Sequence, residues 1–172
     1  RAAKLLEEGF IVAVKGLGGY HLACRAASAL PVQRMRELKG RETKPFAMMG
    51  TLEMIEQHAV VSEKEKELLS RHSSPIVLLK RKENSNIAYP VAPDLKEIGF
   101  MLPYTPIHFL LLQKVKEPLV MTSANITGEP IIFKDEIVPL RELCDYVLSN
   151  DRDIHIFADD SVARVFAGHS YL

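Results

Sequence analysis

Short apolar runs recur along this chain, and segments with helical periodicity separate them. The runs at residues 10–14, 75–79 and 119–122 are continuous enough to be buried strands. Between the last two, Thr105-Pro106 has the pattern of a helix N-cap followed by proline in the first turn. An alternation of five or more strands with four or more helices is typical of an α/β fold, in which helices pack on a sheet.

The other expected elements follow from the same periodicities and from the positions of glycine and proline. A helix is expected behind Pro31, where apolar side chains recur at helical spacing, and another behind Ser62, which forms a capping box with Glu65. No repeat or linker divides the chain, so we expect a single domain over residues 1–172. The remaining expected elements are helices at 2–8 and 51–57, strands at 20–23, 99–102, 154–157 and 161–165, and loops at 15–19 and 82–93.

The composition is that of an ordinary soluble globular protein, with 172 residues, 47% of them hydrophobic and 26% charged. The 22 basic residues balance 22 acidic ones, so no overall field attracts nucleic acid or an anionic membrane. No apolar run approaches the roughly 18 residues of a membrane span. Cys24 and Cys144 lack the spacing of a structural zinc site, and a reducing cytoplasm is the simpler expectation. The chain begins at Arg1 without methionine, which suggests a piece of a longer protein.

Three cations, Lys39, Arg41 and Lys44, lie within six residues just past a patterned helix. An arginine such as Arg41 can hold phosphate oxygens through paired hydrogen bonds, while Lys39 supplies a point charge. The alternative is a solvated helix end, where cations meet the negative pole of the helix dipole.

Small polar side chains follow the apolar run at 119–122, namely Ser123 and Asn125, and Gly128 closes the turn. Ligands in open α/β sheets tend to bind beyond the carboxyl ends of strands, which is where this loop should project. The cations and these hydroxyl and amide groups together predict a nucleotide site. The alternative is that they bond their own backbone in a turn, as these residue types usually do.

Two further segments have both a structural and a functional interpretation. The glycine-containing loop at 15–19 lacks the pattern of a Walker A or dinucleotide-binding loop. It is either a tight turn that needs positive φ or a backbone wall close to a small ligand. Asp159 and Asp160 either bind a divalent cation or lie on opposite faces of an edge strand.

Five segments occur in an order that resembles one family. Together they cover essentially the whole chain and resemble the YrdC-like domain of the hydrogenase maturation carbamoyltransferases, the HypF family, within the wider YrdC/Sua5 superfamily. The resemblance implies a twisted mixed α/β sheet with flanking helices around a central cleft. The segments are GLGGYHLAC at 16–24, KGRETKPFA at 39–47, GFMLPYTPIH at 99–108, MTSANITGEP at 121–130 and DDSVAR at 159–164.

The resemblance also implies a reaction. The domain would join carbamate, derived from carbamoyl phosphate, to ATP with Mg²⁺, giving carbamoyl-adenylate and pyrophosphate on the way to the cyanide ligand of the [NiFe] centre. Lys39 and Arg41 match the family's phosphate-binding K-x-R and are the expected catalytic residues, while no metal-binding residue is expected. The residues expected to bind ATP and substrate are Lys39, Arg41, Lys44, Ser123, Asn125 and Ser161.

The family's parent chain places an acylphosphatase-like domain and zinc-finger modules before this domain and a Kae1-like domain after it. Its acceptor is the C-terminal cysteine of the partner HypE. Two alternatives remain: a threonylcarbamoyl-AMP synthase of tRNA modification, and a double-stranded RNA-binding module with a local basic face. Three positions differ from the family pattern, with Arg25 where aspartate is usual, Asn150 where histidine is common and Phe157 where arginine is common.

Overall fold

The computed structural model describes residues 1–135, 137–167 and 169–171. Within these residues a mixed sheet of ten strands forms the centre of the molecule. The strands are β1 (Val12–Lys15), β2 (Tyr20–Arg25), β3 (Ala47–Met49), β4 (Ala59–Val60), β5 (Ile76–Arg81), β6 (Glu97–Met101), β7 (Leu119–Ser123), β8 (Tyr146–Leu148), β9 (Val162–Phe166) and β10 (His169–Tyr171).

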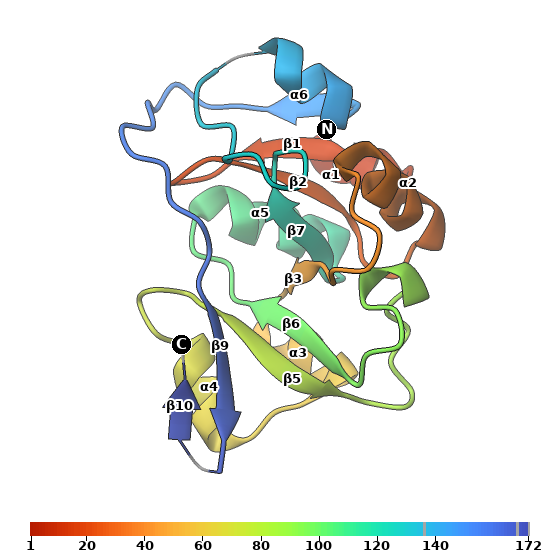
Figure 1. The fold of residues 1–172 in the computed structure, drawn as a ribbon, viewed down its shortest axis with the longest axis vertical. Coiled ribbons are helices and arrows are strands. Elements are labelled where there is room, and N and C mark those ends of the chain that lie inside the picture. The colour runs from red at the N-terminus through yellow and green to blue at the C-terminus, as the bar shows by residue number, and fades with distance from the viewer. Residues whose placement is uncertain (136, 168, 172) are drawn as a thin grey trace.

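The order across the sheet is β10-β9-β5-β6-β3-β7-β2-β1-β8, with β4 paired to β5. The pairs β1–β8, β3–β6 and β5–β9 are parallel, whereas β2–β7 and β3–β7 in the centre are antiparallel. Figure 1 shows the twist of the sheet between β1 at the top and β5 at the bottom. The predicted α/β class, a twisted mixed sheet with flanking helices, is confirmed.

Most of the helices lie where the sequence predicts a helix. The helices expected at 2–8 and 51–57 appear within one residue of these bounds, and those expected behind Pro31, Ser62 and Thr105 are also present. The helices of the described residues are α1 (Ala2–Glu7), α2 (Ala29–Lys39), α3 (Leu52–His58), α4 (Glu63–Leu69), α5 (Pro106–Val115) and α6 (Ile137–Leu143), together with a 3-10 turn at Tyr89–Val91.

Two hydrophobic cores cover the two faces of the sheet, because side chains alternate between faces along each strand. On β2, Leu22 and Cys24 enter the core that contains Val32 and Met35 of α2. Ala23, between them, enters the core that contains Leu111 and Leu112 of α5. The central strands are therefore buried on both faces, which explains their continuous apolar runs.

Local signals fix the ends of the helices. Ser62 and Glu65 form the predicted capping box at the start of α4, and the Thr105 side chain accepts a hydrogen bond from the His108 backbone N–H at the start of α5. Helix α2 ends at Gly40, whose φ of 58° lies in the left-handed region that glycine adopts without strain. This turn directs residues 41–45 away from the helix axis.

The expectation of a strand at 154–157 is wrong. This stretch has no regular secondary structure, and Ile156 and Phe157 are 80% and 50% exposed. Its apolar residues therefore contribute little to the core of the described residues. The elements β3, β4, α6, β8 and β10 were not predicted. No helix among the described residues is long and apolar enough to cross a membrane.

Candidate functional site

A cavity of about 810 Å³ lies beside the centre of the sheet. Its apolar wall includes side chains of β5, and three segments that are distant in sequence bring predicted or polar residues to it. These are the α2–β3 connection with Arg41 and Lys44, the end of β7 with Ser123 and Asn125, and the stretch before β9 with Asp160. Charged side chains at the start of β6 and on β9 also line the cavity, where Glu97 forms an ion pair with Arg164. The structure thus brings four of the six predicted ligand-binding residues to one cavity. Its volume is within the usual range for small-molecule sites.

The α2–β3 connection is held by a buried arginine. Arg36, 6% exposed, donates hydrogen bonds to the carbonyl oxygens of Arg41 at 2.9 Å, Glu42 at 3.1 Å and Lys44 at 3.2 Å. Sequence reasoning did not assign Arg36 to the site. The available signal was its place on the apolar face of the predicted helix, where a charged side chain needs buried partners.

Arg41 faces the cavity with part of its hydrogen-bonding capacity unused. Its Nε donates to the carbonyl oxygen of Lys44 at 3.0 Å and its Nη2 to that of Pro45 at 2.6 Å, and its guanidinium lies 5.0 Å from the centre of the Phe46 ring. Burial and the nearby Arg36 charge lower the pKa of Arg41. Among the described residues neither Arg41 nor Lys44 has a carboxylate partner. Uncompensated cations in a partly buried site favour an anionic ligand.

Lys39 is fully buried and lies behind the cavity lining. Its Nζ donates to the carbonyl oxygens of Ser123 at 2.6 Å and Asn125 at 2.7 Å, and to Asn125 Oδ1 at 2.8 Å. An ammonium group has three donors, so all three are used within the protein. Burial, together with the Arg41 charge, lowers the pKa of Lys39 to about 7. In this structure Lys39 ties the end of α2 to the loop after β7.

The loop after β7 is fixed by local bonds as well as by Lys39. Ser123 Oγ donates to Asn125 Oδ1 at 2.8 Å, and Asn125 Nδ2 donates to the carbonyl oxygen of Glu129. The Ala124 backbone N–H donates to the Tyr20 carbonyl oxygen on β2 at 2.7 Å. Ser123 and Asn125 therefore form the hydrogen bonds of a turn and also line the cavity, so the two alternatives for this loop do not exclude each other.

Ser161 lies just before β9 and outside the cavity lining that the described residues form. Its side chain is exposed, and its carbonyl oxygen accepts a hydrogen bond from the Ile76 N–H at 2.8 Å.

The loop at 15–19 is the expected tight turn between β1 and β2, with the Gly16 N–H donating to the Gly19 carbonyl oxygen at 2.8 Å, but it needs no positive φ and is not a wall of the cavity. Within the described chain, Gly16, Gly18 and Gly19 do not have positive φ, and none of them lines the cavity. Instead the loop receives other segments of backbone. A Cβ on Gly18 would lie 2.8 Å from the backbone N and O of Ala158, and one on Gly19 would meet the side chain of Ile131. Glycine is needed here for close approach of chain segments.

Residues 149–161, which we call the strap, run down one side of the sheet toward β9, in blue in Figure 1. Asp159 and Asp160 lie on the strap and line the cavity, so the edge-strand interpretation is wrong. Asp160 Oδ2 lies 3.1 Å from His21 Nε2 on β2. No group of three or more His, Cys, Asp or Glu side chains in the described part of the chain could hold a metal ion.

The three positions that differ from the expected family pattern lie outside the cavity lining of the described residues. The Arg25 side chain forms an ion pair with Glu117. The carbonyl oxygen of Asn150 accepts a hydrogen bond from Lys15 Nζ at 3.1 Å, and the Phe157 ring packs 5.7 Å from that of Phe133. Each of the three residues therefore has a structural contact of its own.

Comparison with known proteins gives the family. A family model for Sua5, YciO and YrdC, described as "Telomere recombination", matches residues 4–171. The chain belongs to this family. Carbamoyltransferase HypF of Synechocystis sp. is 42% identical over 166 residues, which are 95% of this chain and 22% of that protein. HypF of Rhodobacter capsulatus is 43% identical over the same shares. Threonylcarbamoyl-AMP synthase of Mus musculus is 30% identical over 127 residues, which are 72% of this chain and 45% of that protein.

Solved structures agree with this assignment of the Sua5/YciO/YrdC family. Full-length HypF in a phosphate- and nucleotide-bound form matches with a TM-score of 0.94 at 44% identity, over 98% of this chain and 23% of that one. HypF of T. kodakarensis matches with a TM-score of 0.93 at 40% identity, over the same shares. A variant of P. abyssi Sua5 matches with a TM-score of 0.86 at 22% identity over 98% of this chain and 53% of that one, which shows the fold. The chain thus spans less than a quarter of the HypF chains that it resembles.

Proposed function

We propose that the cavity binds ATP and that the chain forms carbamoyl-adenylate from carbamate, with release of pyrophosphate. The observation that carries this proposal is the cavity itself, where Arg41 and Lys44 have no carboxylate partner among the described residues and lie beside the Ser123–Asn125 loop. The 44% identity to a HypF structure described as nucleotide-bound supports a nucleotide as the anionic ligand.

The proposed roles follow from the contacts. Arg41 has five N–H groups, of which two bond to the backbone, and the others are available to phosphate oxygens together with the Lys44 ammonium. Ser123 and Asn125 line the phosphate end, and Lys39 holds their loop in place. Ser161 would act from the strap beside the substrate. The expected direct contact of Lys39 with phosphate stays a prediction, and it requires Lys39 to exchange a loop bond for a phosphate bond.

The reaction needs positioning more than covalent help from the protein. A carbamate oxygen bonds to the α-phosphorus of ATP, and the bond from that phosphorus to the pyrophosphate oxygen breaks on the opposite side. Negative charge then accumulates on the leaving pyrophosphate, where Arg41 and Lys44 neutralise it. A magnesium ion, when bound, would neutralise further phosphate charge. Since the described residues offer no cluster of metal ligands, phosphates and water would hold it.

The wider role is also a proposal, because the HypF relatives are more than four times longer than the matched region. In that role the chain is the YrdC-like domain of a multidomain carbamoyltransferase. Carbamate comes from carbamoyl phosphate through an acylphosphatase-like domain that precedes zinc-finger modules, and a Kae1-like domain passes the carbamoyl group to a HypE-type acceptor. The step then contributes to the cyanide ligand of [NiFe]-hydrogenases in the cytoplasm.

The similarity to mouse threonylcarbamoyl-AMP synthase favours one alternative, in which the carbamoyl group comes from threonine and bicarbonate. Pyrophosphate release distinguishes the two. We expect release with ATP, bicarbonate and ammonium, which together supply carbamate, and none on adding threonine to ATP and bicarbonate. ATP with carbamoyl phosphate as the only source of carbamate should give little release, since cleavage of carbamoyl phosphate is assigned to another domain. Threonine-dependent release without ammonium would refute the proposal.

Nucleotide binding provides the second test. Arg41→Ala removes a charge-assisted contact, so ATP affinity measured by calorimetry should fall by about 1.5–3 kcal/mol. The matched control is Arg71→Ala, which removes an exposed arginine outside the cavity lining and should bind ATP as the wild type does. Equal affinity of Arg41→Ala and wild type would remove Arg41 from the site.

A further inference from the structure

A small group of histidine and tyrosine side chains lies next to the part of the strap that lines the cavity. His21 on β2 is 3% exposed, and His108 on α5 is 1% exposed. The two imidazole rings are 6.4 Å apart, and Tyr104 packs edge-on against His108 at 4.7 Å. His21 is the cross-strand partner of Ser123, so it lies directly beside the polar end of β7.

Among the described residues, Asp160 is the only carboxylate that forms an ion pair with this group, and only one of its two carboxylate oxygens is used in that pair. Its Oδ2 accepts from His21 Nε2 at 3.1 Å, since a carboxylate can only accept. Its Oδ1 has no hydrogen-bond partner among the described residues, although Asp160 lines the cavity. Both ring nitrogens of His108 and Nδ1 of His21 are buried without a partner in the described part of the chain. Burial lowers the pKa of His108 to about 4, so His108 is neutral and does not compete for the carboxylate.

The backbone of the strap is anchored on both sides of Asp160. The Ala158 N–H donates to the Gly18 carbonyl oxygen at 3.1 Å, and the Ser161 carbonyl oxygen accepts from the Ile76 N–H at 2.8 Å. Gly18 leaves no room for a Cβ at this contact, because one would lie 2.8 Å from the Ala158 backbone. Two backbone bonds and the His21 side chain therefore fix where the Asp160 carboxylate points.

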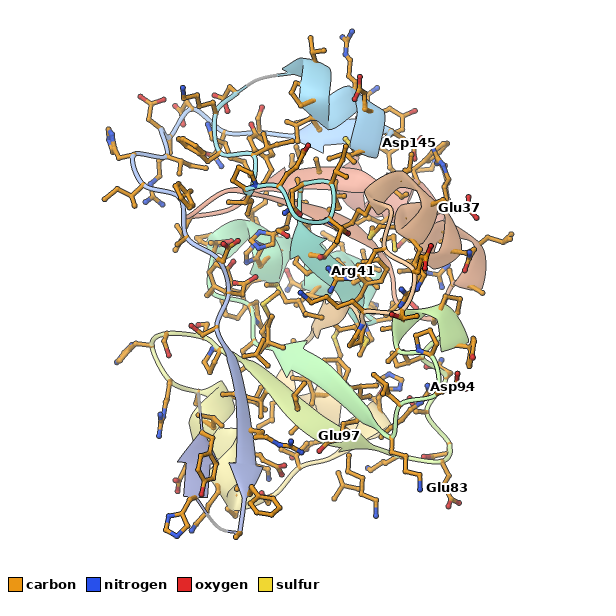
Figure 2. All side chains as sticks on the ribbon, viewed as in Figure 1. Glu37, Arg41, Glu83, Asp94, Glu97 and Asp145 are labelled. Carbon is orange, nitrogen blue, oxygen red and sulfur yellow. The ribbon has the colours of Figure 1, made fainter. Side chains whose placement is uncertain are left out.

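We infer that Asp160 accepts a hydrogen bond from the amino group of carbamate and that His21 is the positioning residue that holds Asp160 for this contact. The inference rests on the proposed function. A carboxylate repels phosphate oxygens and the oxygens of carbamate alike, so Asp160 would meet carbamate at its amino group, which supplies N–H donors. Figure 1 shows the strap and the segment at 40–46 on opposite sides of β7, and Figure 2 shows Arg41 on the side away from the strap. In-line displacement places the nucleophile opposite the leaving pyrophosphate, and thus on the side of the cavity away from these cations.

The test measures two quantities on His21→Ala, Asp160→Ala and the conservative His21→Gln, whose side-chain amide can donate in place of Nε2. The first is KM for carbamate in pyrophosphate release, with carbamate supplied by bicarbonate and ammonium. The second is the affinity for ATP, with and without Mg²⁺. We expect KM to rise roughly 10- to 100-fold in both alanine variants, the size of one charged hydrogen bond, while ATP affinity stays within about twofold. His21→Gln should recover most of the loss. The matched control is His155→Ala, an exposed histidine on the strap, which should behave as wild type.

Other outcomes overturn the inference. Weaker ATP binding by Asp160→Ala only when Mg²⁺ is present would assign Asp160 to a metal ion, and weaker binding in both conditions would assign it to the nucleoside. An unchanged KM would remove both residues from substrate recognition. Amide hydrogen exchange of residues 158–161 tests the positioning role without any reaction: His21→Ala should speed exchange there, and unchanged exchange would contradict that role. If the wild type releases no pyrophosphate with carbamate, the proposed function and the carbamate assignment both fail, and the exchange result alone decides the role of His21.

Discussion

Replacing Lys39 by methionine should change how the stability of the chain depends on pH. The substitution keeps the length of the side chain and removes an ammonium group that is fully buried and bonded to three oxygens of the Ser123–Asn125 loop. Burial and the neighbouring Arg41 charge lower the pKa of Lys39 from 10.5 to about 7. Between these two pH values the unfolded chain binds more protons than the folded chain, so the free energy of unfolding of the wild type rises with pH in this window.

The size of the effect follows from the shift. One pKa unit corresponds to about 1.4 kcal/mol, and integrating from pH 7, where Lys39 is half protonated, to pH 9 gives a gain of about 2 kcal/mol for the wild type. Lys39→Met lacks this contribution. The difference in unfolding free energy between wild type and Lys39→Met should therefore shift by about 2 kcal/mol in favour of the wild type over these two pH units.

Urea unfolding at pH 6, 7, 8 and 9 measures this difference. Lys44→Met is the matched control, because it removes an exposed lysine of the same segment and leaves Lys39 in place. The control should follow the wild-type curve. Parallel curves for wild type and Lys39→Met between pH 7 and 9 would refute the reasoning, since they would mean that the buried site does not disfavour the ammonium.

Three further predictions concern residues away from the cavity. Arg25→Asp places a second carboxylate against Glu117, so it should lower the free energy of unfolding by about 1–2 kcal/mol and leave ATP affinity unchanged. The double variant Arg25→Asp with Glu117→Arg exchanges the two charges and should recover stability, whereas tighter ATP binding by Arg25→Asp would contradict a purely structural role. Ser62→Ala removes the capping box of α4 and should cost about 0.5–2 kcal/mol in urea unfolding, with no cost if the cap is not formed. Cys24 is fully buried, and burial raises the pKa of its thiol, so a thiol reagent should modify Cys24 only as urea unfolds the chain. Fast labelling of Cys24 in the folded chain would contradict its burial.

The strands that were easiest to predict from the sequence are those that have a neighbouring strand on each side in the sheet. The apolar runs at 10–14, 75–79 and 119–122 correspond to β1, β5 and β7, which lie inside the sheet. The outer strands β8 and β10 were missed because each has only three residues and their side chains are largely exposed. The reverse error occurred at 154–157, where apolar residues sit in an exposed strap.

The candidate site also contains residues that could be predicted from the sequence and residues that could not. The spacing of residue types suggested Arg41, Lys44, Ser123 and Asn125 but left structural alternatives open, and the family resemblance selected these four residues, which the structure places around one cavity. The pairing of His21 with Asp160 joins residues 139 positions apart, and nothing local marks it. It depends on the register between β2 and β7 and on the path of the strap, neither of which a single sequence specifies.

The contrast between Lys39 and Arg41 illustrates what residue spacing leaves open. Two cations separated by one glycine suggest a pair that acts together on phosphate. In the structure Lys39 is the last residue of α2 and points into the protein, whereas the left-handed conformation of Gly40 turns the chain so that Arg41 reaches the cavity. Lys39 thus holds the Ser123–Asn125 loop in place, and Arg41 lines the cavity together with that loop. Because this division depends on a φ of 58° at a single glycine, the conformation of Gly40 decides which charge a ligand meets.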